Sequence, residues 1–327
     1  MAADCVADAA FVAVRNATGC PSSSWQAVVA DAVPRAAPVT MVNVGANKGY
    51  ALVEFLGLWT QHGVSAKTWS RAIKWYANKT HSKWLASNAC GFCGDCRQAS
   101  PAKHSRSSGV AHALELAANN RALLREVAVE TGLAAAIRVH NYAASNMTTS
   151  MLHVPIFAGG ETRSLQTADD KICQKGGCTE RVDVTTIDDF FRAQSIASVY
   201  HLTIDTEGYD ALVLEGAAES LRARRVALLE FEVSKGGYWT TRKRPSLAHY
   251  RERRTLRATT RKLDAAGYAC FWQTEAGLVP LSGPCWRPEF DMFRTWSNVV
   301  CAHEAPVVAV LVRLAKESLQ RRRGRGE

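Results

Sequence analysis

The feature that most constrains the fold is a repeated alternation of short apolar runs with helix-like patterns. The runs are rich in Val, Ile and Leu, as buried strands are, and the segments between them carry apolar residues at helical spacing. This alternation predicts an α/β protein with a mostly parallel sheet and helices on both faces. The expected strands are residues 39–44, 110–116, 136–143, 198–204, 225–233 and 268–273. The expected helices are residues 50–59, 120–131, 186–194, 209–224 and 246–266.

Composition places the chain among ordinary globular proteins. Its 327 residues are 47% hydrophobic and 21% charged, which excludes collagen-like, coiled-coil and wholly disordered proteins. No apolar run approaches the roughly 18 residues of a membrane span. The N-terminus carries acids where a signal peptide carries Lys or Arg. The default expectation is a cytoplasmic protein, and a lumenal one stays open if the natural start is missing.

The pattern also divides the chain into parts. Residues 1–38 are Ala-rich and look like an N-terminal leader with one short helix, and residues 39–304 form the expected domain. A polar, basic, cysteine-containing insertion interrupts the domain at 61–108, and residues 144–180 are expected to form an irregular excursion with short strands. Residues 305–327 are expected to form a C-terminal helix and an Arg-rich tail. The oligomeric state stays open.

The formal charge of +10 comes from 40 Lys and Arg against 30 Asp and Glu. The excess is concentrated in residues 61–110, in residues 242–262 and in the C-terminal arginines. Such a basic face can attract phosphate or an acidic glycan. Because no nucleic-acid motif accompanies the charge, a solvated helix surface is the favoured interpretation, and no specific nucleic acid is expected as a partner.

Ligands of such sheets bind at the carboxyl ends of the strands, so the residues that follow each strand are informative. Gly45 and Gly49 follow the first strand without the third glycine of a pyrophosphate loop or the ending of a phosphate loop. This turn should therefore face something other than a polyphosphate. Glu115 follows the second strand and could accept bonds from both hydroxyls of a ribose. The alternative is an exposed Glu at a helix start.

The strongest signal follows the fourth core strand. Asp205 and Glu207 are two residues apart, so in an extended segment both project from one side and can converge on one pocket. One acid could cap the next helix, but capping does not explain two. Glu230 and Glu232 in the fifth strand either line the floor of a cleft or face solvent at an edge. Residues 185–189 contain two capping-box spacings and are interpreted as structural.

Three segments, taken in order, resemble the FkbM family of S-adenosylmethionine-dependent methyltransferases: residues 42–49 (VNVGANKG), 184–190 (VTTIDDF) and 204–217 (IDTEGYDALVLEGA). The resemblance covers roughly residues 40–300. It implies a Rossmann-like methyltransferase fold, a mostly parallel seven-stranded sheet with one antiparallel strand near its end, and methyl transfer usually to a hydroxyl oxygen. The chain departs from the family pattern at Asn43, usually Asp, and at Thr203, usually Lys.

The resemblance and the strand ends together give a site hypothesis. Asp205 and Glu207 are expected between the cofactor and the acceptor, where one serves as general base or orients the acceptor hydroxyl. The acceptor is expected to be a sugar, lipid or small metabolite. The residues expected to bind S-adenosylmethionine are Asn43, Gly45, Asn47 and Gly49 at its methionine part and Glu115 at its ribose.

Two other functions stay open at this stage. A nicotinamide-dependent oxidoreductase shares the sheet and the ribose acid, but the missing third glycine and the paired acids disfavour it. A non-catalytic, degenerate methyltransferase fold could instead bind an anionic partner, and Asn43 and Thr203 keep this alternative open.

The ten cysteines have more than one interpretation. Cys90, Cys93 and Cys96, with His104 as a fourth ligand, could bind one zinc ion. Disulfides or free thiols are together favoured over zinc, so no metal is included among the expected ligands.

Overall fold

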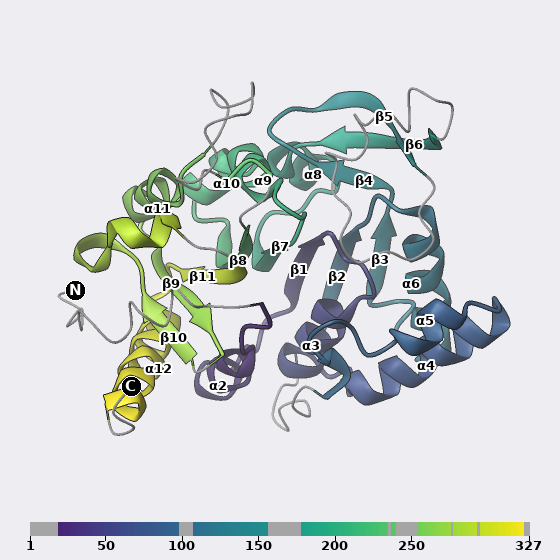
Figure 1. Ribbon diagram of the computed structural model, residues 1–327, viewed down its shortest axis with the longest axis horizontal. Coiled ribbons are helices and arrows are strands. Elements are labelled where there is room, and N and C mark those ends of the chain that lie inside the picture. Colours follow the sequence, from purple (N-terminus) through teal and green to yellow (C-terminus); the bar gives the residue numbers. More distant parts are fainter. Residues whose placement is uncertain are drawn as a thin grey trace.

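The computed structural model describes residues 19–97, 107–155, 178–234, 237–239, 254–275, 277–292 and 295–323. Its centre is a twisted sheet of eight strands (Figure 1). The strands are β1 (Val39–Val44), β2 (Gly109–Leu114), β3 (Ile137–His140), β7 (Val199–Ile204), β8 (Val226–Ser234), β9 (Ala269–Thr274), β10 (Gly277–Pro280) and β11 (Trp296–Ala302).

The strand order is β10-β9-β11-β8-β7-β1-β2-β3. The five strands from β3 to β8 are parallel, while β11 runs antiparallel to both of its neighbours. The expected antiparallel strand near the end of the sheet is therefore present. The sheet has eight strands, one more than the expected seven. The additional strand is β10, an antiparallel edge strand that begins at Gly277 and pairs with β9.

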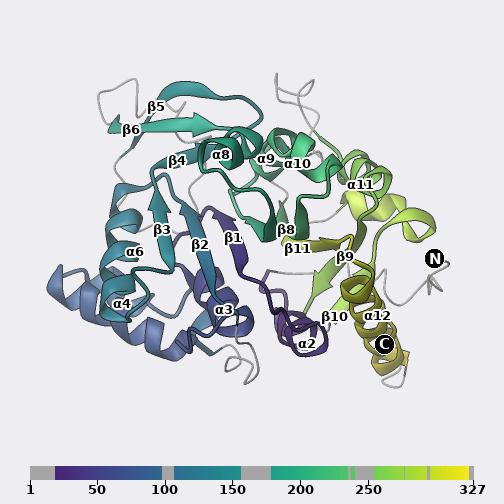
Figure 2. The same ribbon diagram turned by 180° about the vertical axis from the view of Figure 1, so that it is seen from behind.

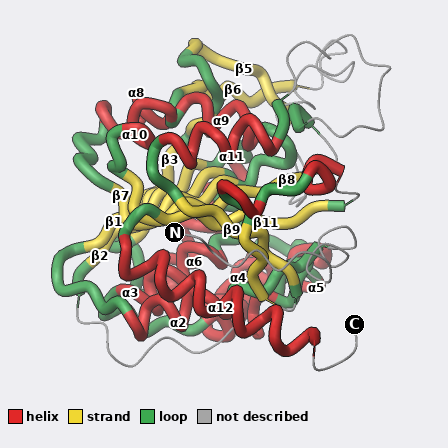
Figure 3. Tube along the Cα trace, turned by 90° about the vertical axis from the view of Figure 1, so that its left-hand side faces the viewer, coloured by secondary structure: helices red, strands yellow, loops and turns green. Residues whose placement is uncertain are grey.

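Two helical layers enclose the sheet, as the sequence predicts (Figure 3). On one side lie α2 (Ser24–Ala32), α3 (Tyr50–Trp59), α4 (Ala66–Lys79), α5 (Lys83–Ser87), α6 (Ala118–Glu130) and α12 (Ala305–Arg323). On the other side lie α8 (Ile187–Ala193), α9 (Asp210–Gly216), α10 (Ala218–Arg222) and α11 (Leu256–Ala265). Short 3-10 helices are η1 (Asp95–Arg97), η4 (Gly283–Cys285) and η5 (Pro288–Met292). Within the described ranges no helix has the length and apolarity to cross a membrane.

A small second sheet, in the order β4-β6-β5, lies beside the carboxyl ends of the first strands (Figure 2). Its strands are β4 (Tyr142–Ala144), β5 (Thr149–Pro155) and β6 (Cys178–Thr185). The single strand expected at residues 136–143 was wrong, because the chain leaves the main sheet after His140 and continues as β4 in the small one. The short strands expected in the excursion are β5 and β6.

Two expected helices differ from the structure. The helix expected at 209–224 is interrupted at Ala217, directly after Gly216, where a Cβ would lie 2.1 Å from the Ser145 oxygen and glycine is therefore required. The basic helix expected from residue 246 begins only at Leu256, where the Thr255 side chain accepts the Ala258 N–H and caps it. Residues 240–253 lie outside the described ranges.

The capping interpretation of residues 185–189 is confirmed in part. Thr186 Oγ1 accepts the Asp189 N–H at 3.0 Å at the start of α8. Asp188 does not complete a second box; its carboxylate accepts the N–H groups of Glu219 and Ser220 and so joins α8 to α10.

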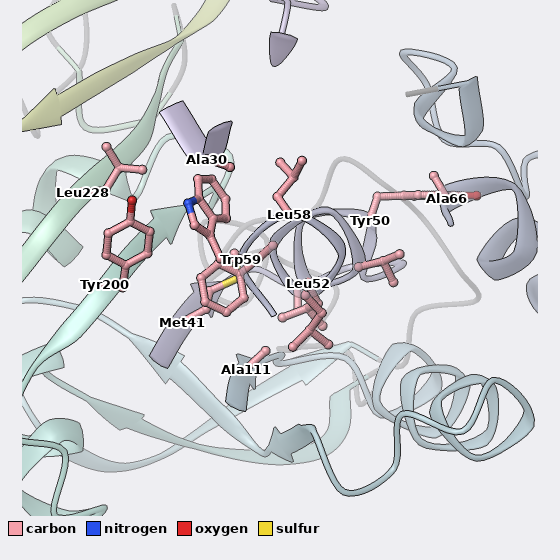
Figure 4. Close-up of a cluster of buried hydrophobic side chains, with 14 of the residues drawn as sticks. Ala30, Met41, Tyr50, Leu52, Leu58, Trp59, Ala66, Ala111, Tyr200 and Leu228 are labelled. Atoms are coloured by element: carbon pink, nitrogen blue, oxygen red, sulfur yellow. The ribbon is translucent and has the colours of Figure 1, made fainter. Parts of the chain in front are cut away.

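The core is divided by the sheet into two apolar layers. Side chains alternate along each strand, so Met41 packs with α2 and α3, while Val42 packs with α8 and α9. Figure 4 shows the first layer, in which Trp59 of α3 lies between Met41 and Tyr200 of the sheet. This layer fixes α3, and with it the turn that precedes α3, on the parallel strands.

Candidate active site

The turns after β1 and β7 are in direct contact at the carboxyl ends of these neighbouring strands. Asp205 N donates to Val44 O at 2.9 Å, and a Cβ at Gly45 would lie 1.8 Å from Asp205 O. Gly45 also has a φ of +81°, which favours glycine. The site hypothesis requires these two sheet edges to meet, and they do.

Glu115 at the tip of β2 holds the first turn in place. Its Oε2 accepts the N–H of Asn47 at 2.7 Å, and its Oε1 accepts the N–H of Ala117 at 2.8 Å. Asn47 takes a left-handed φ of 47°, which Asn tolerates better than most residues. The side chain of Glu115 is buried, so the alternative of an exposed helix-start Glu is wrong. Glu115 is not among the described residues that line the cavity below, and its ribose role stays a prediction.

Gly49 is required by the packing of neighbouring helices, and its role at the cofactor stays a prediction. A Cβ there would lie 2.6 Å from Leu124 Cδ2 and 3.0 Å from Trp69 Cζ2, which belong to helices packed against the turn. Trp69 Nε1 also donates to Lys48 O at 2.7 Å. The insertion therefore supports the first turn through α4.

A cavity of about 400 Å³ opens beside the two turns. This is the size range of small-molecule sites in proteins. Its walls come from the ends of β1 and β7, from β8, β9 and β11, from α3, from the segment before and at the start of α2, and from residues 91–95. Asn43, Gly45, Asn47, Gly49, Asp205 and Glu207 all line it.

A third acid, Asp210 at the start of α9, holds the turn after β7 in place. Asp210 is fully buried, and its carboxylate accepts the N–H groups of Thr206 at 3.1 Å and Gly208 at 3.0 Å. No side chain of the described residues caps α9, so neither Asp205 nor Glu207 is a capping acid, and both lie along the cavity wall. Glu207 has a left-handed φ of 56°, a strained conformation of the kind that clusters at functional sites.

The environment of these two acids favours their protonated forms. Desolvation by the surrounding protein, together with the negative charges of Glu230, Asp95 and Glu115, raises the pKa of Asp205 to about 6. The side chain still has contact with solvent. Burial and the neighbouring Asp205 raise the pKa of Glu207 to about 7. A carboxylate with a pKa near neutrality is suited to accept a proton under physiological conditions.

Glu230 and Glu232 form part of the cavity floor. Both are buried on a strand inside the sheet, so the alternative of a solvent-facing edge is wrong. Glu230 Oε1 accepts Gln273 Nε2 at 2.8 Å and Asn298 Nδ2 at 3.1 Å. Glu232 accepts the N–H of Glu207, while its Oε2 has no hydrogen-bond partner among the described residues.

The two departures from the family pattern lie side by side. Asn43 and Thr203 are register partners on β1 and β7, and Asn43 Nδ2 donates to Thr203 Oγ1 at 2.7 Å. Both line the cavity, and Asn43 Oδ1 is without a partner in the described part of the chain. A neutral, hydrogen-bonded pair thus occupies the two positions where the resemblance implies an acid and a base.

Sequence reasoning missed several cavity residues. Glu54 is the one charged residue in the α3 sequence YALVEFLGLW, and a lone acid in an apolar helix was the available signal. Pro21, Ser23 and Gln26 precede or begin α2, and no local pattern connects that segment with a cavity more than a hundred residues away along the chain in β7. Asp95 likewise reaches the cavity through the folding of the insertion.

The cysteines of the insertion form disulfides, Cys90 with Cys96 and Cys20 with Cys93. The alternative of a zinc site at these thiols is therefore wrong; its fourth ligand, His104, lies outside the described residues. No cluster of His, Cys, Asp and Glu suited to a metal occurs in the described ranges. The Cys20–Cys93 bond joins the segment before α2 to residues 91–95, and both line the cavity.

The protein is expected to lose stability as the pH rises from about 4.5 to 8, and Glu54→Gln should remove part of this loss. Burial raises the pKa of Glu54 to about 8, with added effects of Glu230 and Asp95, whereas its ordinary value is 4.5. The folded state therefore holds the proton more tightly than the unfolded state, and this stabilisation is complete below pH 4.5 and lost through pH 8. Melting temperatures of both proteins between pH 5 and 8.5 test this. Equal pH dependence in the two would contradict it.

Solved structures show remote similarity to the chain. They include an FkbM methyltransferase from Methylobacillus flagellatus KT, with 15% identity and a TM-score of 0.33, covering 61% of this chain and 34% of that chain. A protein of the NADB-Rossmann superfamily from Streptococcus agalactiae has 11% identity and a TM-score of 0.32, covering 86% and 68%. The human methyltransferase 10 domain containing protein has 8% identity and a TM-score of 0.32, covering 85% and 80%.

A search of curated proteins finds no match. The sequence does match the family described as "Methyltransferase FkbM domain" over residues 43–268, which is more than half of its length. That span includes both turns, the twin acids and all five parallel strands apart from the start of β1. The fold and the family therefore agree, and the chain belongs to the FkbM methyltransferase family.

Proposed function

We propose that this chain transfers a methyl group from S-adenosylmethionine to a hydroxyl oxygen of a small molecule or glycan. The observation that supports the proposal is the position of Asp205 and Glu207, which line one cavity together with the glycine turn after β1. A methyl donor and a proton acceptor can then face each other across a single site.

The residues present fit such a methyl donor. The cavity has the volume of a small-molecule site, and Gly45 and Asn47 of the turn after β1 line it. Asn43 Oδ1, unpartnered among the described residues, offers an acceptor for an amino group, and Lys48 lines the same wall as a possible partner for a carboxylate. These residues would hold the amino acid part of the donor.

The protein's own contribution is positioning and proton transfer. Bound S-adenosylmethionine supplies an electrophilic methyl group on a sulfonium sulfur, and the sulfur keeps the electron pair of the broken bond. The acceptor oxygen forms the new bond to carbon, and its proton passes to the carboxylate of Glu207. Asp205, with the lower pKa of the two, stays ionised beside it and orients the acceptor.

Cofactor binding and turnover are measured separately to test this proposal. Calorimetry with S-adenosylmethionine should show one site, and labelled methyl groups should appear on hydroxyl compounds from a panel of sugars, lipid headgroups and phenols. Tight binding of reduced nicotinamide dinucleotide instead, or no binding of S-adenosylmethionine to folded protein, would reject it.

A non-catalytic module for an anionic partner is not favoured by the cavity, because acids predominate among the charged residues that line its described walls. The test above separates this alternative, since such a module would bind polyanions in a salt-dependent way without turnover.

Breaking the Cys20–Cys93 bond is expected to weaken cofactor binding about tenfold. The bond fixes two cavity walls to each other, and releasing them adds roughly 1–2 kcal/mol of ordering entropy per residue to the cost of binding. The measurement is the dissociation constant for S-adenosylmethionine in Cys20→Ser, Cys93→Ser and the double variant. Because all three remove the same bond, their effects should be equal; additive effects would show that the thiols act separately.

A further inference from the structure

Acidic residues predominate in the cavity, although basic residues predominate in the chain as a whole. The whole protein carries a formal +10, yet acids outnumber bases among the described residues that line the cavity. Lys48 is the basic residue of this lining, and the acids come from four separate parts of the fold: α3, residues 91–95, the turn after β7, and β8. The acids are Glu54, Asp95, Asp205, Glu207, Glu230 and Glu232.

One of these acids has an unmet hydrogen-bonding atom. Glu232 is 5% exposed and lines the cavity, and its Oε2 is buried without a partner among the described residues. An unsatisfied buried carboxylate oxygen is costly, and a ligand that donates a hydrogen bond there removes the cost. The carboxylate form of Glu232 can only accept at this atom, so an N–H or O–H donor of a ligand is the partner that stabilises that form.

The methyl donor accounts for only part of this acidity. Its sulfonium and ammonium charges are offset by its own carboxylate, so it brings a single net positive charge against the six carboxyls. A metal ion is not a suitable counter-charge, because no metal-binding cluster occurs in the described ranges and Glu230 is engaged by two side-chain amides. The remaining group that can bring positive charge to these acids is the methyl acceptor.

We propose that the acceptor is a cationic hydroxyl compound, an amine-bearing small molecule or amino sugar whose ammonium group lies against Glu232. The inference rests on the proposed methyltransferase function and specifies its substrate class. Glu232 accepts the N–H of Glu207, so the ammonium site adjoins the residue that takes the hydroxyl proton. An amine and a hydroxyl a few bonds apart in one molecule would reach both.

Ionisation supports the same assignment. Burial, followed by the charges of Asp205, Asp210 and Glu207, holds the pKa of Glu232 well above its ordinary range. An ammonium ion at Oε2 supplies the counter-charge that the cavity lacks and favours the carboxylate. Binding of a cationic acceptor is therefore expected to release a proton, whereas binding of a neutral one is not.

Three six-carbon alcohols that differ only in their far group test the proposal: 6-amino-1-hexanol, 1,6-hexanediol and 6-hydroxyhexanoate. Calorimetry measures their binding to protein saturated with S-adenosylhomocysteine, in two buffers of different ionisation enthalpy. Labelled methyl transfer gives their kcat/KM. The amine is expected to bind at least about tenfold more tightly than the diol, because a charge-assisted hydrogen bond typically contributes that much to affinity. Its binding should also release a proton. The hydroxyhexanoate should bind least.

Glu232→Gln keeps the shape and the bond to Glu207 and should remove most of the preference for the amine. Glu130→Gln is the matched control, because it removes an exposed acid at the end of α6 and should leave the preference unchanged. If the amine binds no more tightly than the diol, or if Glu232→Gln keeps the full preference, the proposal is wrong. Failure of the proposed function differs from both, since S-adenosylhomocysteine itself would then not bind.

Discussion

Glu207→Gln is expected to slow methyl transfer by about 100-fold to 10,000-fold, the usual contribution of general acid–base catalysis. Gln fits the same space but cannot take a proton from the acceptor hydroxyl. Because Glu207 has a pKa near 7, the wild-type rate should rise with pH as this carboxyl ionises, and the variant should lack that rise. The affinity for S-adenosylmethionine should change by less than about threefold, so that the loss is in kcat.

Two control variants test whether Glu207 acts as the general base or only contributes negative charge to the cavity. Asp205→Asn should reduce turnover less than Glu207→Gln and leave the rise with pH in place, although the inflection moves down because Asp205 contributes to the raised pKa of Glu207. Glu219→Gln, an exposed acid of α10, should behave as wild type. If Asp205→Asn alone removed the pH dependence, the roles of the two acids would be reversed.

Sequence patterns predicted the parallel half of the sheet because its strands are buried on both faces. Residues 39–44 and 198–204 are nearly continuous apolar runs, and the structure has β1 and β7 within one residue of them. The step from β3 to the small sheet had no such signal, since residues 136–143 contain no Gly or Pro and one residue separates the two strands. The edge strand β10 is four residues long, too short to be detected by period.

The site was predictable where chemistry follows a strand directly. Gly45 and Asp205 could be paired because the carboxyl ends of neighbouring parallel strands meet at one edge. No pattern in the sequence shows that Asp210 accepts the N–H groups of the turn after β7, or that Glu54 forms part of the cavity wall. The pairing of Cys20 with Cys93 joins residues 73 apart, and spacing alone does not select it. The Cys20–Cys93 bond forms only when the insertion is folded and α2 is packed on the sheet.

Gly45→Ala is expected to destabilise the protein by about 3 kcal/mol or more and to abolish cofactor binding. The new methyl group would lie 1.8 Å from the Asp205 carbonyl oxygen, which neighbouring strands hold in place. Both the left-handed backbone, which costs roughly 1–2 kcal/mol for other residues, and the forced separation of the two turns contribute. Chemical denaturation measures the free energy of unfolding, and calorimetry measures S-adenosylmethionine binding.

Gly132→Ala isolates the contact from the backbone effect. Gly132 has a similar φ of +74°, but a Cβ there would meet no described atom within 4 Å, so only the left-handed cost of about 1–2 kcal/mol applies. Gly132→Ala should therefore keep full cofactor affinity, while Gly45→Ala loses it. Equal destabilisation in the two variants, with binding retained in both, would mean that the turns after β1 and β7 can separate without damage. The cavity would then not depend on their contact, and the assignment of Asp205 and Glu207 to one site with the glycine turn would lose its structural basis.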